Sequence, residues 1–266
     1  MTPALLAISD LHINHPENRR FLERLVPSSD GDQLIVAGDV CETADAVIET
    51  LRTLRERFDR VIWCPGNHEL WTSPHDECRL GGVARYEHLV RSLREVGVVT
   101  PEDDYPVFES AEGPVRIASM MTLYDHSFRP RDGAEELPLT DVALLQCDPY
   151  PDIGRWCRDR VEDTYQRLRT QSDPDVPYIL VNHYPLVQRP VDSVYFQGIA
   201  PWCGTSLTAS WHREFPVRSM VYGHLHIRRR SYIDGVRFDE VSVGYPREWK
   251  QRPDSPGPVT ILTGRT

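Results

Sequence analysis

Two histidines near the end of the chain, His224 and His226, have the spacing of a metal-ligand pair. On an extended backbone, side chains two positions apart leave from the same side of the strand. Two neutral imidazoles that converge in this way can bind a metal ion. Such a pair is more often two half-exposed strand residues, so the prediction of a metal site depends on further ligands elsewhere in the chain.

Four other short stretches carry carboxylate, amide or imidazole groups suited to the same chemistry. They contribute, in chain order, Asp10 and His12, Asp39, Asn67 and His68, and His183. With the first pair, these stretches hold five of the ten histidines in the sequence. Each stretch alone has an ordinary explanation as a polar loop, but five in series predict one shared site.

Each stretch follows a segment with the apolar pattern of a buried β-strand. The expected strands lie at 3–9, 33–37, 60–64, 177–181 and 218–222, and the expected helices at 17–26, 44–58, 84–96 and 153–170. Alternating strands and helices predict an α/β fold with functional loops at the carboxyl ends of the strands. Asp10, Asp39 and Asn67 are each one strand–helix unit apart, so they can meet at one edge of a sheet.

The rest of the chain predicts smaller elements. Short strands are expected at 97–100, 105–109 and 115–120, a hairpin about Asp234-Gly235, and an antiparallel edge formed by 241–243 and 259–262. The stretch 121–152 has several prolines and no sustained period, which predicts a lid or an insertion. No low-complexity linker divides the sequence, so 1–266 is expected to form a single domain.

The composition is that of an acidic globular protein of 266 residues, with 40% apolar and 26% charged residues. The apolar runs near its start are too short to span a membrane, and no basic segment precedes them as in a signal peptide. The six scattered cysteines form no C-x-x-C pair, which fits a reducing compartment and predicts a cytoplasmic location. The net charge of −10 argues against nucleic acid and anionic membranes as partners.

The polar stretches, taken in order, resemble the motif set of the calcineurin-like metallophosphoesterase family. The motifs are Asp10-Leu11-His12, Gly38-Asp39, Gly66-Asn67-His68-Glu69, Asn182-His183 and Gly223-His224-Leu225-His226. The resemblance covers most of the chain. It implies a four-layer αββα sandwich of two mixed β-sheets flanked by helices, with two metal ions at the carboxyl edge of the strands.

The resemblance also implies two sets of metal ligands that share one carboxylate. Asp10, His12 and His226 would hold the first ion, Asn67, His183 and His224 the second, and Asp39 would bridge both. Two divalent or mixed-valence ions about 3.5–4 Å apart need such a bridging anion. The mixed nitrogen and oxygen ligands suit manganese, iron or zinc and do not choose between them.

The activity that the resemblance implies is hydrolysis of a phosphoester by in-line attack of a metal-bridging hydroxide on phosphorus. Asp39 and His68 would be catalytic, with His68 assisting departure of the leaving group, and Asn67, His68 and Tyr124 are candidates to contact substrate. The alternative for His68 is a structural hydrogen bond to Asp39 or Asp10. The extension with a phosphate-binding arginine that protein Ser/Thr phosphatases carry after Gly-Asp is absent here, which disfavours that subfamily.

The substrate is predicted less directly. Segments 85–89, 202–205 and 244–249 resemble an actinobacterial branch of the family that includes phosphopantetheinyl hydrolase, which implies a phosphodiesterase acting on phosphopantetheinyl acyl carrier protein. A cyclic-nucleotide or other small-molecule phosphodiesterase or phosphomonoesterase is the alternative. A non-catalytic scaffold that binds a protein partner is a more remote one, because all the proposed ligands are present. The basic run 228–230 fits either a substrate phosphate or a solvated hairpin face.

Overall fold

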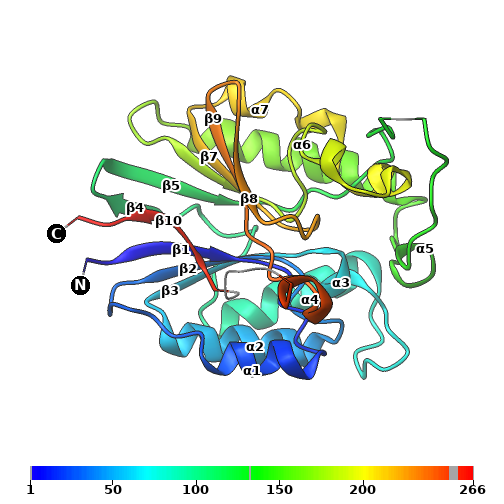
Figure 1. The fold of residues 1–266 in the computed structure, drawn as a ribbon, viewed down its shortest axis with the longest axis horizontal. Coiled ribbons are helices and arrows are strands. Elements are labelled where there is room, and N and C mark those ends of the chain that lie inside the picture. Colours follow the sequence, from blue (N-terminus) through cyan, green and yellow to red (C-terminus); the bar gives the residue numbers. More distant parts are fainter. Residues whose placement is uncertain (1, 132, 252–256, 266) are drawn as a thin grey trace.

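The computed structural model describes residues 2–131, 133–251 and 257–265, and two β-sheets lie at its centre (Figure 1). In the described residues, the first sheet has four strands in the order β10-β1-β2-β3. These are β1 (Ala4–Ile8), β2 (Gln33–Ala37), β3 (Arg60–Cys64) and β10 (Val259–Thr263). The first three are parallel, and β10 adds an antiparallel edge beside β1.

The second sheet has six described strands in the order β4-β5-β6-β7-β9-β8. Their bounds are β4 Val107–Ser110, β5 Gly113–Ser119, β6 Tyr178–Val181, β7 Val217–Tyr222, β8 Arg229–Ile233 and β9 Val236–Glu240. The inner four strands are parallel, while β4 and β8 are antiparallel edges. Both sheets are therefore mixed, as predicted.

Alternation along the strands produces the layers of the molecule. In β1, Leu5 and Ala7 face the second sheet and join a buried cluster with Ile179 and Val221 from that sheet. The neighbouring residues Leu6 and Ile8 point the other way and belong to the core under the helices. Successive strand side chains point to opposite faces, so strands buried on both sides need apolar residues at nearly every position.

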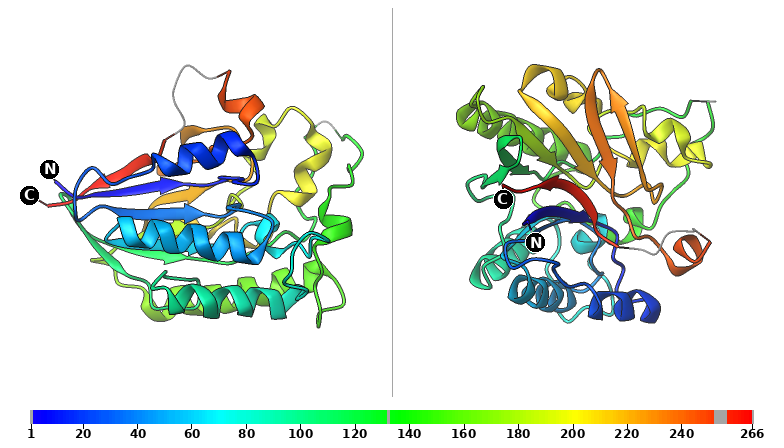
Figure 2. Two further views of the ribbon diagram at one scale, coloured as in Figure 1. Left: turned by 90° about the horizontal axis from the view of Figure 1, so that it is seen from below. Right: turned by 60° about the vertical axis from the view of Figure 1, so that its left-hand side comes forward.

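Helices cover the outer face of each sheet (Figures 1 and 2). The first sheet is covered by α1 (Pro16–Glu23), α2 (Ala44–Arg57) and α4 (Gly82–Glu95), and the second by α6 (Ile153–Gln171) and α7 (Trp211–Glu214). In α2 the buried Val47, Leu51 and Leu54 recur at helical spacing and form the apolar face. The predicted four-layer αββα sandwich is confirmed.

The hairpin at Asp234-Gly235 is confirmed, and both residues have positive φ angles of 51° and 82°. Two left-handed residues in a row match the twist of a tight hairpin. The expected edge strand 259–262 is also confirmed, as β10.

Two strand predictions are wrong. The stretch 97–100 forms only an isolated bridge, between Val99 and Ile62, because Gly97 has a φ of +79° and a turn follows at once. The stretch 241–243 does not form an antiparallel edge. Its Ser242 makes a parallel bridge to Ser9, and Val241 N–H donates to Tyr222 C=O, so this stretch connects the two sheets.

The carboxyl ends of the parallel strands lie at the end of the molecule opposite both chain termini (Figure 1). Short helices gather there: α3 (Asn67–Leu70), α5 (Asp141–Leu144) within the 121–152 stretch, and α8 (Pro246–Trp249). Short 3₁₀ turns follow β6 at Val191–Ser193, Gln197–Trp202 and Ser206–Thr208. In the described parts of the chain, no helix is both long and apolar enough to cross a membrane.

Candidate metal centre

Five of the seven predicted ligands lie in sharp left-handed turns at the strand ends. Positive φ angles occur at Asp10 (52°), His12 (41°), Asp39 (56°), His224 (69°) and His226 (54°). The expectation that each residue pair extends along a strand is therefore wrong. A left-handed residue with a β-carbon costs roughly 1–2 kcal/mol, and such strain concentrates at functional sites. These turns aim the side chains across the strand ends.

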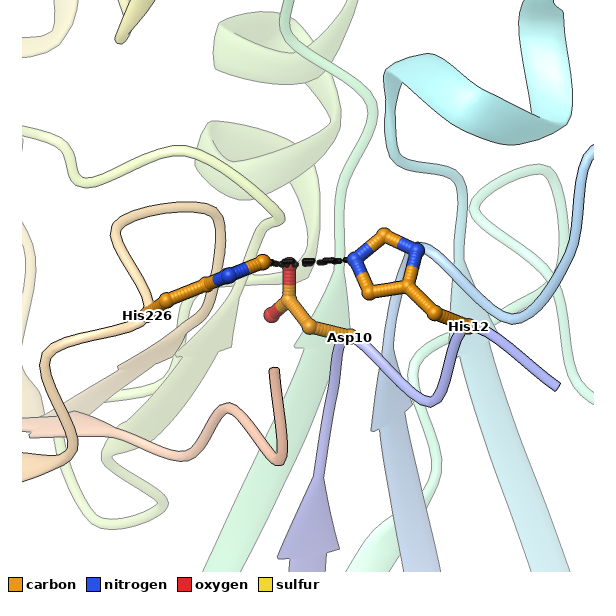
Figure 3. A group of neighbouring side chains, drawn as sticks. All are labelled: Asp10, His12 and His226. Carbon is orange, nitrogen blue, oxygen red and sulfur yellow. Dashed lines mark hydrogen bonds and ion pairs between the residues drawn. The ribbon is translucent and has the colours of Figure 1, made fainter. Parts of the chain in front are cut away.

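Asp10, His12 and His226 form one cluster whose ligand atoms lie close together (Figure 3). Asp10 Oδ1 is 3.1 Å from His226 Nε2 and 4.0 Å from His12 Nε2, and the two ring nitrogens are 3.3 Å apart. The carboxylate lies between the two rings in Figure 3. This is the arrangement predicted for the first ion.

Asp39, His183 and His224 form the second cluster. His183 Nε2 is 3.4 Å from Asp39 Oδ2 and 3.2 Å from His224 Nδ1. Asp39 Oδ2 also lies 4.0 Å from His12 Nε2, so this carboxylate stands between the clusters as a bridging ligand must.

Among the described residues, the amide oxygen of Asn67 has no hydrogen-bond partner. In the described residues Asn67 Oδ1 is buried and accepts no hydrogen bond, while Nδ2 donates to Asp141 Oδ1 at 2.9 Å. A buried acceptor left unpaired costs about 1–3 kcal/mol, which coordination to a cation would offset. The Asn67 oxygen and the two clusters fit a dinuclear metal centre.

Hydrogen bonds to the far ring nitrogens set the orientation of two histidines. His183 Nδ1 donates to the Ala37 carbonyl at 2.9 Å, and His226 Nδ1 lies 2.7 Å from Glu248 Oε2. Each bond leaves Nε2 directed at the centre, as in the carboxylate–histidine–metal arrangements of metalloproteins. The sequence reasoning missed Glu248. Glu248 follows Tyr245 by three positions at the start of α8, which indicates a helix-capping residue. This position does not indicate a contact with His226.

Positive charge stabilises the two buried carboxylates. Burial acts to raise the pKa of Asp10, but the charge and hydrogen bond of His226 outweigh it and hold the pKa below 3.8. Burial likewise acts to raise the pKa of Asp39, but the charges of His183 and His68 outweigh it and hold that pKa well below 3.8. Burial acts to lower the pKa of His183 and His226, yet Asp39 and Asp10 respectively raise each to about 10.

The other two imidazoles behave oppositely. Burial is the largest influence on His12 and His224, and it lowers the pKa of each to about 3. Both rings are therefore neutral at physiological pH, which is the form that binds metal. The protons on the remaining two rings supply charge that a bound cation would replace.

His68 lies directly beside the Asp39 carboxylate. Its backbone N–H donates to Asp39 Oδ1 at 3.0 Å, whereas its ring nitrogen Nε2 is 3.8 Å from Asp39 Oδ2. The ring packs against Trp71 with 3.7 Å between centroids and an angle of 32° between the ring planes, and Nδ1 is 3.6 Å from Glu42 Oε1. The backbone therefore makes the structural hydrogen bond to Asp39. The imidazole lies beside the same carboxylate, because His68, His12 and Asp39 form a third group of close ligand atoms.

Buried carboxylates also hold the loops themselves. Glu69 accepts from the backbone N–H groups of Asp39 and Gly66 at 2.9 Å and of Val40 at 2.8 Å, so it joins the turns after β2 and β3. Burial raises the pKa of Glu69 to about 7. Asp10 Oδ2 accepts in turn from the hydroxyls of Ser9 and Ser242.

Tyr124 lies behind the ligands. Its side chain is 1% exposed, and its hydroxyl donates to Asp141 Oδ2 at 2.8 Å. Trp71 Nε1 donates to Asp141 Oδ1 at 2.8 Å, beside the Asn67 amide. Contact between Tyr124 and substrate stays a prediction. Asp141 itself was not expected, and neither its spacing nor its neighbours in the sequence indicated it.

A two-sheet α/β protein whose strand ends gather carboxylates and imidazoles around a shared aspartate is of the dinuclear metal-dependent hydrolase class. The chain belongs to the calcineurin-like phosphoesterase family, whose sequence model matches residues 4–228. The family that the motif order predicted is thereby confirmed, and with it a hydrolytic enzyme that uses divalent metal ions.

Two comparisons with individual proteins agree with this family. The chain is 48% identical over 261 residues to the [acyl-carrier-protein] phosphodiesterase PptH of Mycobacterium tuberculosis, covering 94% of this chain and 80% of that protein. It also matches the crystal structure of the phosphopantetheinyl hydrolase PptH from Mycobacterium tuberculosis with a TM-score of 0.94 and 47% identity, covering 98% of this chain and 96% of that one.

Proposed function

We propose that the chain is a phosphodiesterase that hydrolyses the bond between phosphopantetheine and an acyl carrier protein. The observation that carries this proposal is the pair of neighbouring ligand clusters with Asp39 between them, in a chain 48% identical to a protein described as an acyl-carrier-protein phosphodiesterase. The structural likeness to phosphopantetheinyl hydrolase supports the same substrate.

The proposed ligands divide as the clusters do. Asp10, His12 and His226 would hold one ion, and Asn67, His183 and His224 the other. Asp39 is grouped with His183 and His224 and also with His12, so it would bridge both ions. Manganese, iron and zinc all suit this mixed donor set, with divalent or mixed-valence ions. When bound, the ions would neutralise the charge of the phosphate and lower the pKa of a bound water to near neutral.

The chain's own residues orient the reaction. The backbone N–H of His68 and the turns joined by Glu69 hold Asp39 in place. The Asn67 amide donates to Asp141 through Nδ2, which leaves its oxygen free to bind an ion. As a neutral ligand it would preserve the net positive charge of the centre. His68 stands at the same edge and would donate a proton to the departing oxygen, the role we assign to it.

Several broader expectations remain proposals. The segment 121–152 would act as a lid or an insertion. Residues 1–266 would form a single domain, which the apolar core between the two sheets supports. We place the enzyme in the cytoplasm, where the six free cysteines would stay reduced. A cyclic-nucleotide or other small-molecule phosphoesterase remains the alternative. The complete ligand set disfavours a non-catalytic scaffold.

The test combines metal analysis with two substrates. We expect about two manganese, iron or zinc ions per chain, hydrolysis of bis-p-nitrophenyl phosphate, and conversion of holo to apo acyl carrier protein, followed by mass spectrometry. Chelation should abolish both activities and metal addition should restore them. A metal-replete protein that cleaves the small diester but leaves the holo protein intact would contradict the proposed substrate. A protein that binds no metal and cleaves neither would contradict the enzyme.

A further inference from the structure

A cleft of about 520 Å³ beside the edge strand β8 is lined by exposed arginines from separate parts of the chain. They are Arg131 from the 121–152 stretch, Arg189 from the loop after β6, and Arg229 and Arg230 from β8. The basic run in β8, for which the sequence left two explanations open, thus forms part of a larger basic surface. We call this surface the arginine cleft.

The positive charge of the arginine cleft is only partly neutralised. Arg230 Nε pairs with Asp239 Oδ1 at 2.7 Å, and Asp192 adds one carboxylate to the lining. In the described residues, no ion pair within 4.0 Å is formed by Arg131, Arg189 or Arg229, although the hydrogen bond of His212 and, less strongly, the charge of Arg189 lower the pKa of Asp234. On a chain of net charge −10, this is a local patch of the opposite sign.

Exposed aromatic side chains accompany this charge. Tyr232 lines the arginine cleft and is 64% exposed. Tyr195 and Phe196, which are 90% and 64% exposed, follow the lining residue Ser193 by two and three positions. Within the described chain these are the three most exposed aromatic side chains. Arginine beside exposed aromatic residues is the composition of protein interfaces.

The arginine cleft is connected to the metal centre through the chain. Arg229 lies three residues beyond the ligand His226, and Arg189 lies six residues beyond the ligand His183. Arg229 Nη2 also lies 3.4 Å from the Pro190 carbonyl, so the two segments meet in the cleft. In the sheet register, Arg229 also pairs with Glu240, which pairs with Tyr222 at the carboxyl end of β7, two residues before His224. The cleft therefore begins at the strand ends that carry the centre, where a macromolecule with a phosphodiester arm could rest.

We propose that the arginine cleft docks an acidic face of the protein that carries the phosphodiester. The proposal rests on the proposed function and adds how the protein part of the substrate is recognised. Guanidinium groups bind carboxylates through two parallel hydrogen bonds, and opposite charge raises the rate of productive encounter. Tyr195, Phe196 and Tyr232 supply the apolar contact that charge alone does not provide.

The test compares a charge-reversed cleft with a matched control. The variant is Arg189→Glu/Arg229→Glu, and the control Arg20→Glu/Arg91→Glu makes the same change in net charge on helices α1 and α4. For holo acyl carrier protein we expect the variant to raise KM about tenfold or more with kcat little changed, because rim charges act mainly on association. Hydrolysis of bis-p-nitrophenyl phosphate should match the wild type, and the control should behave as wild type with both substrates.

Salt supplies a second measurement. The wild-type kcat/KM for the holo protein should fall as ionic strength rises, and the variant should lose most of this dependence. Arg189→Gln/Arg229→Gln, which removes charge without reversing it, should give an intermediate KM. It also keeps the test valid if the reversed variant folds poorly.

The outcomes separate the two proposals. If the wild type cleaves the holo protein and the cleft variants keep its KM, the docking surface is wrong and the proposed function stands. If both substrates lose activity equally, the cleft binds the phosphodiester itself, which overturns protein docking. If the wild type cleaves only the small diester, the proposed substrate fails and the docking proposal fails with it.

Discussion

At the scale of single residues, the candidate centre depends on side chains whose types were evident in the sequence and whose orientation was not. Asn67 and His68 are adjacent in the short helix α3, and their side chains make separate contacts. The Asn67 amide is held by Asp141 with its oxygen unpaired among the described residues, whereas the His68 ring packs against Trp71. These different contacts lead to different predicted effects of substitution.

Asn67→Ala and His68→Ala should both impair turnover, but only the first should weaken metal binding. Removal of a general acid lowers kcat by about 10²–10⁴-fold, and His68→Ala should do so while retaining about two ions per chain. Asn67→Ala should also lower the affinity for one of the two ions by at least about tenfold, measured by competition with a chelator. His88→Ala in α4 is the control and should affect neither quantity. Full activity of His68→Ala on a diester with a poor leaving group would contradict the acid role.

At the scale of elements, the 121–152 stretch contacts the predicted ligand Asn67 through helix α5. Asp141 in α5 accepts hydrogen bonds from Asn67, Trp71 and Tyr124. The backbone of the same stretch is tied to the loop after α3, because Thr72 N–H donates to the Leu144 carbonyl at 2.8 Å. This part of the stretch therefore positions a predicted ligand, in addition to any part it has in selecting substrate.

Asp141→Ala should weaken metal binding, because it releases the amide of Asn67 and leaves Trp71 Nε1 and the Tyr124 hydroxyl without their acceptor. Loss of an orienting partner of this kind costs about 10–100-fold in metal affinity. Calorimetric titration of metal into the metal-free protein measures the change. Val142→Ala, a neighbouring exposed position in α5, serves as the control. Unchanged metal affinity together with a raised KM would instead place Asp141 in substrate recognition.

At the scale of the whole molecule, the helices that cover opposite sheets are joined through Glu102. Its Oε1 accepts from the Tyr86 hydroxyl in α4 and from Arg160 Nη2 in α6, each at 2.5 Å. Burial acts to raise the pKa of Glu102, but the charge of Arg160 and the two hydrogen bonds lower it below 4.5. An ionised carboxylate therefore connects the two outer layers.

Glu102→Gln should lower the free energy of unfolding at pH 7 by about 1 kcal/mol, a typical value for losing a partly exposed charged hydrogen bond. A carboxyl group whose pKa is depressed in the folded state stabilises the fold above its unfolded pKa, and this stabilisation is lost as pH falls through the lower folded pKa. The difference between variant and wild type should accordingly shrink below pH 4.5. Urea denaturation across this range measures it.

The control for this prediction is Glu87→Gln, an exposed position on α4. It should change unfolding by less than about 0.5 kcal/mol at either pH, as is usual for surface substitutions. A Glu102→Gln deficit that stays constant from neutral to acidic pH would show that the carboxylate charge is not what stabilises the link.

The sequence by itself determined the order of strands and helices, the family, and the identities of the predicted ligands. These features are local: an apolar run of five residues followed by a polar turn is visible within each segment, and the strand ends must share an edge once the sheet is parallel. The two wrong strands, at 97–100 and 241–243, lie where a turn and a connection between the sheets outweighed a short apolar pattern.

Only the tertiary structure decided what surrounds those ligands. Glu248 reaches His226 across 22 positions of sequence, and Asp141 reaches Asn67 across 74. The arginine cleft likewise joins Arg131, Arg189 and Arg229 from three segments. Such contacts leave no periodic signal, because they depend on how the loops fold over the sheet edge. The chemistry could therefore be predicted from the sequence, whereas the residues that orient the ligands, and the cleft proposed as a docking surface, could be found only in the folded molecule.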